Sequence, residues 1–408
     1  MVLQGRRLAA PTIAMAAILL SVFAARAMAA ADRFAEPGGN GANPCDFSDP
    51  CSIETAVSGA ASGDNVVPLG GTYNVSTTLQ LPPDVDLQSG TGAVINSTAS
   101  PAITVVASSP NTVVRGITLN QNNASGTGLE LLSGQALQDV INSNGNNACV
   151  ITGGITTALM TESVCNNSSG TGVAINSFSA VDSSAEIFDV TAVSGNLALF
   201  VSATAPDADV TLTGGNVIAQ GTSADQSGFN SNNTSTTSHI ELSNSNFDSF
   251  QFAGPGTSGT AADVNNNQSE LPLLDGTFHE LPGSPTINAG TVFPQSAFVD
   301  IDGDDRPQGA AMDIGADEAE GEAPDTNIDG KPPKRTSKRT AKFQFSSTDP
   351  GEVTFDCKID GKPFKPCESG IKYQNLKRGK RHKFQVRSTD GFFNTDETPA
   401  KYGWRITG

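Results

Sequence analysis

Residues 126–212 read GTGLELLSGQALQDVINSNGNNACVITGGITTALMTESVCNNSSGTGVAINSFSAVDSSAEIFDVTAVSGNLALFVSATAPDADVTL, and one short phrase recurs through them. Each recurrence opens with a Gly or Asn turn and continues into a short apolar strand. The openings fall at residues 126, 146, 170 and 194, so the steps are 20, 24 and 24 residues. The apolar strands begin at Leu129, Cys149, Val173 and Leu197. Self-similarity at a fixed period of this length indicates a solenoid.

A second short strand follows each opening, beginning at Val140, Ser163, Ile187 and Val210. The runs are too short to be helices, and no Asn-Gly or Asp-Gly hairpin pairs one with the next. We therefore expect an all-β fold, a parallel β-helix in which each strand pairs with its copy one coil later. A low-complexity linker is the alternative, but a linker has no reason to keep apolar triplets in step.

Charge divides the chain into two parts. The net charge of the 408 residues is −18, yet residues 1–323 carry 6 basic and 32 acidic side chains, whereas residues 324–408 carry 18 and 10. Two compositions this different predict two domains. The acidic first part disfavours nucleic acid and anionic membranes as partners, and the basic second part could contact an anionic glycan or cell-wall polymer. A solvated basic face on an ordinary domain is the alternative for the second part.

Residues 1–31 have the pattern of a signal peptide. Arg6 and Arg7 precede an apolar stretch, and Ala27-Met28-Ala29 or Ala29-Ala30-Ala31 supplies a cleavage site. No later segment is long and apolar enough to span a bilayer. We therefore expect a secreted protein, extracellular or at a bacterial cell surface and monomeric.

Export makes the six cysteines candidates for disulfides. Sequence position favours Cys45–Cys51 and Cys357–Cys367, while Cys149 and Cys165 leave two alternatives open, a disulfide or two buried thiols. No CxxC occurs, and the histidines are His239, His279 and His382. We therefore expect no cofactor and no metal centre of the Cys/His kind.

The segment DPCSIETAV, residues 49–57, precedes a GD…G-x-Y pattern. Ser52 is placed to cap a short helix, with Glu54 in its first turn. The segment resembles the CSLREA motif at the N-terminus of bacterial secreted β-helix proteins, with Ile53 in the place of the leucine, although Thr55 departs from that spelling. The resemblance implies a right-handed parallel β-helix, the pectate-lyase-like fold, whose open N-terminal end the helix covers.

Residues 281–318, LPGSPTINAGTVFPQSAFVDIDGDDRPQGAAMDIGADE, resemble the closing segment of choice-of-anchor Q β-helix proteins. Asn288 and Asp317 depart from the family's usual aspartate and aromatic residue. Arg306 stands among several aspartates, so we expect it to hold the last loop through bidentate pairs. The expected cap residues are Arg306, Asp313 and Glu318.

Three alternating aspartates, Asp300, Asp302 and Asp304, surround Gly303 and offer hard oxygen ligands. They make calcium a candidate ligand. Ala311 occupies the position where an EF-hand loop has its bidentate glutamate, so a structural cap is the favoured interpretation of this loop.

After a linker at 319–325, residues 326–408 alternate apolar and polar residues through six or seven short strands. This pattern predicts a small β-sandwich. The module resembles the immunoglobulin-like or fibronectin-III-like modules of bacterial secreted proteins. Together with a β-helix over 45–318, these assignments complete the expected domain organisation. We expect Trp404, the only tryptophan, to be a core anchor rather than a sugar platform.

The inferred fold resembles that of pectate lyases and polygalacturonases, but fold alone does not establish catalysis. Such lyases need a basic residue, and Arg115 is the only one between Phe34 and Asp305. A hydrolase needs two suitably spaced carboxylates. Weak candidates for a catalytic set are the clustered acids Asp182, Glu186 and Asp189.

We therefore expect a non-catalytic structural or surface-binding β-helix protein, adhesin-like in role. The alternatives are a carbohydrate-active enzyme, either polysaccharide lyase or glycoside hydrolase, and a glycan-binding module.

Overall fold

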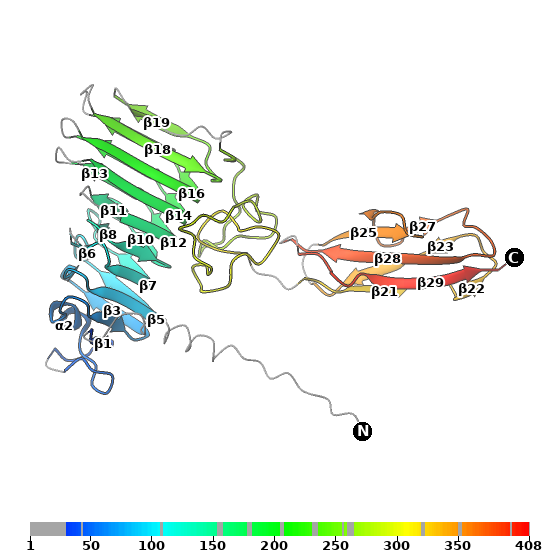
Figure 1. The fold of residues 1–408 in the computed structure, drawn as a ribbon, viewed down its shortest axis with the longest axis horizontal. Coiled ribbons are helices and arrows are strands. Elements are labelled where there is room, and N and C mark those ends of the chain that lie inside the picture. The colour runs from blue at the N-terminus through cyan, green and yellow to red at the C-terminus, as the bar shows by residue number, and fades with distance from the viewer. Residues whose placement is uncertain are drawn as a thin grey trace. The chain divides into compact units, whose positions relative to one another are not determined.

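The computed structural model describes residues 30–41, 44–106, 109–152, 158–177, 182–204, 208–230, 236–254, 257–258, 265–319, 323–349, 353–391 and 394–407. The expected signal peptide, apart from residues 30 and 31, lies outside these ranges. The fold is all-β (Figure 1). The described residues contain one helix, α2 (Ile53–Ser58). The chain divides between Gln268 and Ser269 into two compact units. Residues 281–318 lie in the second unit, and the domain limits expected from the sequence stay a prediction.

The first unit is a parallel β-solenoid, as the repeat predicted. The strands of its first sheet have the order β1-β2-β5-β7-β10-β12-β14-β16-β18-β20; in addition, β3 pairs with β5, and β9 pairs with β7 and β12. The strands of its second sheet have the order β4-β6-β8-β11-β13-β15-β17-β19. The strands of the first sheet are β1 (Asp32–Ala35), β2 (Asn65–Pro68), β3 (Gly71–Val75), β5 (Asp86–Ser97), β7 (Val113–Gln121), β9 (Gln135–Leu137), β10 (Val140–Ser143), β12 (Ala158–Asn167), β14 (Ser183–Ser194), β16 (Asp209–Gly221), β18 (Thr237–Ser243) and β20 (Thr257–Ser258). Those of the second are β4 (Leu79–Leu81), β6 (Ile103–Val105), β8 (Thr127–Leu131), β11 (Asn147–Thr152), β13 (Thr171–Ser177), β15 (Leu197–Ala203), β17 (Ala224–Asn230) and β19 (Phe250–Ala253).

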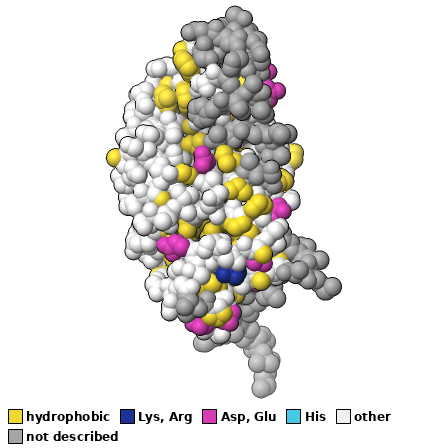
Figure 2. Space-filling model, turned by 90° about the vertical axis from the view of Figure 1, so that its left-hand side faces the viewer, with side chains coloured by type: hydrophobic (Ala, Val, Ile, Leu, Met, Phe, Trp, Pro, Cys, Tyr) yellow, Lys and Arg dark blue, Asp and Glu magenta, His cyan; other side chains and the backbone are white. Residues whose placement is uncertain are grey.

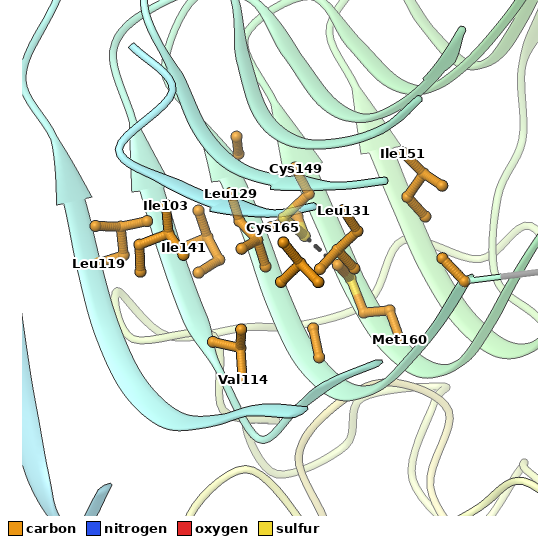
Figure 3. Packing of buried hydrophobic residues seen from close by; sticks show 14 of the residues in the cluster. Ile103, Val114, Leu119, Leu129, Leu131, Ile141, Cys149, Ile151, Met160 and Cys165 are labelled. Carbon is orange, nitrogen blue, oxygen red and sulfur yellow. Dashed lines mark hydrogen bonds between the residues drawn. A yellow bond between two sulfur atoms is a disulfide. The ribbon is translucent and has the colours of Figure 1, made fainter. Parts of the chain in front are cut away.

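Inward side chains stack into columns along the solenoid (Figure 3). One column is Ile103, Leu129, Cys149, Val173 and Leu199, each paired with the next in parallel register and buried. Because each apolar side chain lies over another one coil away, burial of the whole column depends on the repeat staying in step.

The fourth repeat differs from the sequence prediction by two residues. Val173 pairs with Leu199, not with Leu197, so the steps along this column are 20, 24 and 26 residues. The extra length lies between β13 and β14, because Asn176 and Ala185 are 9 residues apart, whereas the residues they pair with one coil earlier, Thr152 and Ala158, are 6 apart. The turn after Ser194 is one residue shorter than its counterpart after Asn167, since Leu197 pairs with Thr171.

Three strands bend at residues with left-handed backbone. Glu162, Asp189 and Asn216 have φ of 44°, 54° and 51° and occupy the same position in β12, β14 and β16. The two short strands expected in each repeat are present as separate strands, the first in the second sheet and the second in the first sheet, where from β12 to β16 it forms part of a longer bent strand. Asn and Asp tolerate this backbone conformation better than other non-glycine residues.

The N-terminal end is covered as the sequence predicted. The Ser52 hydroxyl accepts a hydrogen bond from the Thr55 N–H at 3.3 Å and caps α2. Ile53, Ala56 and Val57 face the solenoid core. The disulfide Cys45–Cys51 holds the preceding loop.

All three expected disulfides are present, Cys45–Cys51, Cys149–Cys165 and Cys357–Cys367. The alternative of two buried thiols at Cys149 and Cys165 is therefore wrong. Both residues are fully buried, and their bond joins β11 to β12 across the interior of one coil (Figure 3).

The second unit contains turns and isolated bridges within 269–319 and then a strand-rich module. The module's sheet has the order β22-β29-β28-β25-β26, and two further pairs are β21–β24 and β23–β27. Their bounds are β21 (Thr326–Gly330), β22 (Arg335–Thr336), β23 (Ala341–Lys342), β24 (Gln344–Ser347), β25 (Thr354–Ile359), β26 (Lys365–Pro366), β27 (Lys372–Tyr373), β28 (Arg381–Thr389) and β29 (Ala400–Ile406). Phe343, Phe384 and Trp404 form the centre of its core, with Phe343 and Phe384 stacked at 4.0 Å between ring centroids. This arrangement is consistent with the expected β-sandwich, and Trp404 is a core residue.

Candidate functional sites

The three acids considered for catalysis lie in three different environments. Asp182 is exposed just before β14, and its Oδ1 accepts the N–H of Asp209 at 3.0 Å. Glu186 is half-buried in β14, beside Leu159 and Thr213 of the neighbouring coils. Asp189 is fully buried at the corner, and its Oδ1 accepts from Asn216 Nδ2 at 2.7 Å. Asp182 and Asp189 therefore each use an oxygen to join one coil to the next.

The three aspartates considered for calcium do not share one environment either. Asp300 is buried, and its carboxylate accepts hydrogen bonds from the N–H groups of Asp302, Asp304 and Glu318. Burial raises the pKa of Asp300 to about 6, although the hydrogen bonds from these N–H groups lower it. Asp302 is exposed and faces His279 instead. Asp300 therefore shapes the loop from within and presents Asp302 on its surface.

The expected cap residues lie together around a buried guanidinium. Arg306 Nε donates to Glu318 Oε2 at 3.2 Å, Nη1 donates to the carbonyl of Gly315, and Nη2 donates to the carbonyl of Asp313. Burial raises the pKa of Asp313 to about 7, and the nearby negative charge of Glu318 contributes a smaller part of this increase. The arginine satisfies backbone carbonyls as well as an acid, so it ties the loop to itself.

A basic groove of about 1020 Å³ lies on the strand-rich module. It is formed by the ends of β25, β27, β28 and β29 and the turns between them. Six of its lining residues are exposed cations: Lys362, Lys377, Lys380, Arg381, Lys383 and Lys401. Among the described residues that line the groove, one is acidic, Asp360. Its carboxylate is bonded to His382 Nδ1 at 2.7 Å and accepts the Lys383 N–H at 3.0 Å. The groove therefore has a strong positive charge.

A ladder of asparagines follows the outer face of the first sheet. Each Nδ2 donates to the Oδ1 of the asparagine one coil earlier, at 3.0 to 3.2 Å, through Asn166, Asn142, Asn120, Asn96 and Asn74. In Figure 2, uncharged polar side chains and backbone cover much of the face, together with hydrophobic side chains, and charged groups are few and scattered. The solenoid thus presents hydrogen-bonding groups in regular rows.

Sequence reasoning found the positive charge of the C-terminal part but not the groove, because its six cations come from several separate turns. It also missed a cluster of His279, Asp302 and Asp317, whose ligand atoms lie within 4.8 Å of one another. The only sequence signal was that Asp317 replaces an aromatic residue of the family pattern.

The geometry defines an all-β protein with a parallel β-solenoid and a separate unit that carries a basic groove. No family model and no curated protein matches the chain. Among solved structures, the chain is similar to a pectate lyase, Pel9A, with a TM-score of 0.37 and 14% identity over 72% of this chain and 97% of that one. In the part of the chain that the structure describes, no helix is long and apolar enough to cross a membrane.

Proposed function

We propose that this is a secreted, non-catalytic β-helix protein that attaches to an anionic surface polysaccharide through the basic groove of its C-terminal unit. The observation that carries the proposal is the groove itself. Six exposed cations line one concavity, and the one described acid in it is already paired with His382.

An anionic polymer suits this groove better than a small ligand. The cations are lysines and one arginine on exposed strand ends, so they can contact successive charges along a chain without fixing one geometry. Charges this close together attract a polyanion over a distance comparable to the Debye length, about 8 Å at physiological salt. Uronate or phosphate groups would meet that requirement.

The role of the solenoid in this proposal is structural. Two of the three acids considered for catalysis contribute to coil-to-coil hydrogen bonds, Asp182 to Asp209 and Asp189 to Asn216. The three disulfides are consistent with an extracellular protein. The acidic composition of residues 1–323 would disfavour close approach of a polyanion to the solenoid.

The test is retention of the full mature chain on immobilised polygalacturonate compared with a neutral glucan, over a range of salt concentrations. We expect retention on the polyanion alone, weakening as salt rises. Lys377→Glu, Lys380→Glu and Lys383→Glu combined should abolish retention, since all three side chains are exposed and their replacement leaves the core intact.

The matched control is Lys342→Glu, Lys365→Glu and Lys372→Glu, which changes the net charge equally with exposed lysines outside the groove lining. It should retain most of the binding. An equal loss of retention in the two triple variants would mean that the groove does not determine binding to the polyanion. Release of new reducing ends from the polymer would favour the alternative function, a carbohydrate-active enzyme.

A further inference from the structure

His279 lies at the centre of a cluster of carboxylates in the second unit. Its Nε2 is 2.5 Å from Asp302 Oδ2 and 4.0 Å from Asp317 Oδ1. The three residues come from three separate turns, and each can offer one ligand atom to a common point. Ligands of a tetrahedral ion with bonds of about 2.1 Å stand roughly 3.4 Å apart. To reach this geometry, the 2.5 Å distance from His279 to Asp302 must lengthen and the 4.0 Å distance from His279 to Asp317 must shorten, each by roughly 1 Å or less.

The imidazole is already oriented for ligation. Its other nitrogen, Nδ1, is 2.8 Å from Thr277 Oγ1 and 3.6 Å from Asp275 Oδ1. Asp275 also accepts the N–H groups of Thr277 and His279, which fixes the turn that carries the histidine. The Thr277 hydroxyl bonds in turn to Asp275 Oδ1 at 2.8 Å, so the outer nitrogen reaches a carboxylate through the hydroxyl. Polar partners of this kind hold the ring orientation of metal-ligating histidines.

Glu280 supplies an independent observation that points to a ligand. Its side chain is next to the cluster and only 4% exposed, and neither oxygen receives a hydrogen bond from any residue that the structure describes. Its neighbour is the buried carboxylate of Asp317, and the Glu280 N–H donates to Asp317 Oδ2 at 2.8 Å. Two acceptor groups side by side need either a proton or a cation between them.

We propose that His279, Asp302 and Asp317 bind a divalent transition-metal ion, with Glu280 as the fourth ligand or as the acceptor for a bound water. The ion would bind beside the two buried acids and would satisfy the Glu280 oxygens. It would also join three turns of this segment, the ones around His279, Asp302 and Asp317, into one unit.

The donor set favours zinc over calcium. One imidazole nitrogen with two or three carboxylates suits Zn²⁺ in a tetrahedral site, whereas Ca²⁺ takes six to eight oxygens. The site is half open to solvent, since His279 and Asp302 side chains are 37% and 52% exposed. A chelator should therefore be able to remove the ion without unfolding the chain.

The test is titration of the chelator-treated full chain with Zn²⁺ by calorimetry, together with the visible spectrum of the Co²⁺ form. We expect one Zn²⁺ per chain, a higher melting temperature in Zn²⁺, and no displacement by millimolar Ca²⁺. His279→Gln and Asp302→Asn should remove stoichiometric binding. Thr277→Val, which removes the hydroxyl that bonds to His279 Nδ1 and to Asp275, should weaken the affinity about tenfold or more.

Asp305→Asn is the matched control, because Asp305 is an exposed acid of the same loop outside the cluster. It should bind like the wild type. Asp302 is exposed, so the Asp302→Asn chain should fold, and its melting temperature without metal checks that it does. The absence of stoichiometric binding in the wild type would overturn the proposal, as would unchanged binding in His279→Gln and Asp302→Asn. Neither result depends on the basic groove.

Discussion

Cys149 and Cys165 are bonded across the interior of one coil, with their Cα atoms 5.9 Å apart, so that a single covalent link joins the two sheets of the solenoid. Neither residue is exposed, and Cys165 also contacts Met160 in the same core. The coil is therefore closed by the disulfide as well as by its neighbours.

Replacing both cysteines with alanine should lower the free energy of unfolding of the solenoid. The disulfide closes a separation of 16 residues, for which the chain-entropy model gives about 3 kcal/mol. The same change at Cys45 and Cys51, separated by 6 residues, should cost about 2 kcal/mol. Urea denaturation followed by circular dichroism measures both. Equal stability of wild type and the Cys149/Cys165 variant would contradict the prediction.

The asparagine ladder should contribute to stability in proportion to the bonds removed. Asn120 donates to Asn96 and accepts from Asn142, whereas Asn74 at the end of the ladder takes part in one such bond. With about 1 kcal/mol for each bond, Asn120→Ala should cost about 2 kcal/mol and Asn74→Ala about 1 kcal/mol. Thermal denaturation of the two variants gives the comparison. A larger loss of stability in Asn74→Ala than in Asn120→Ala would show that the number of ladder bonds does not determine the effect.

Asp139 should make the stability of the solenoid depend on pH. It is fully buried, its Oδ1 accepts the N–H of Ile117, and burial raises its pKa to about 8. An unfolded aspartate has a pKa of about 3.9, so between about pH 4 and pH 8 the folded state holds a proton that the unfolded state has released. Stability is therefore greatest below pH 4, falls as pH rises to 8, and is level above that.

Asp139→Asn tests this dependence directly, because the amide oxygen can still accept from Ile117. The variant should match the wild type at pH 4 and exceed it at pH 8, with an upper limit on the order of 5 kcal/mol. Denaturant titrations at both pH values measure the difference. A variant that is less stable than wild type at pH 8 would count against a protonated Asp139.

Arg306 should be essential to the closing segment. Its side chain is fully buried with Glu318, and its removal would leave that carboxylate buried without its ion pair. Arg306→Ala should cost about 3–5 kcal/mol, and adding Glu318→Gln should recover part of this.

The control for this prediction is Arg387→Ala, which breaks the half-exposed pair with Asp356 and should cost less than about 1 kcal/mol. The rate at which a protease cleaves within residues 281–318 measures the local destabilisation caused by Arg306→Ala. Similar protease resistance in Arg306→Ala and Arg387→Ala would contradict a special role for Arg306.

Local features of the fold could be predicted from the sequence. The repeat period and the turn residues predicted the solenoid, and Ser52 predicted the helix cap. The short cysteine separations predicted Cys45–Cys51 and Cys357–Cys367 but left the Cys149–Cys165 bond open. All of these depend on residues close in sequence or one coil apart. The register at Leu199 could not be predicted, because it depends on the length of the connection between β13 and β14, which the repeated phrase does not indicate.

The candidate sites were less predictable, because they combine residues from distant turns. Asp302 was a candidate ligand from its spacing with Asp300, yet Asp300 bonds to backbone N–H groups, and Asp302 faces a histidine 23 residues away. The lysines of the groove were visible as charge alone. Neither grouping follows from spacing, since both depend on how the turns fold against one another.

The asparagine ladder also bears on how a molecule of this kind can change its length. Each inner asparagine of the ladder bonds to an asparagine on both sides, so a duplicated coil, such as one equivalent to residues 120–141, would find matching partners on both sides. Such an insertion would extend the solenoid by about 4.8 Å and leave the existing bonds unaltered. Growth by tandem duplication is thus compatible with the outer surface at every step, and the ends alone need specialised sequence.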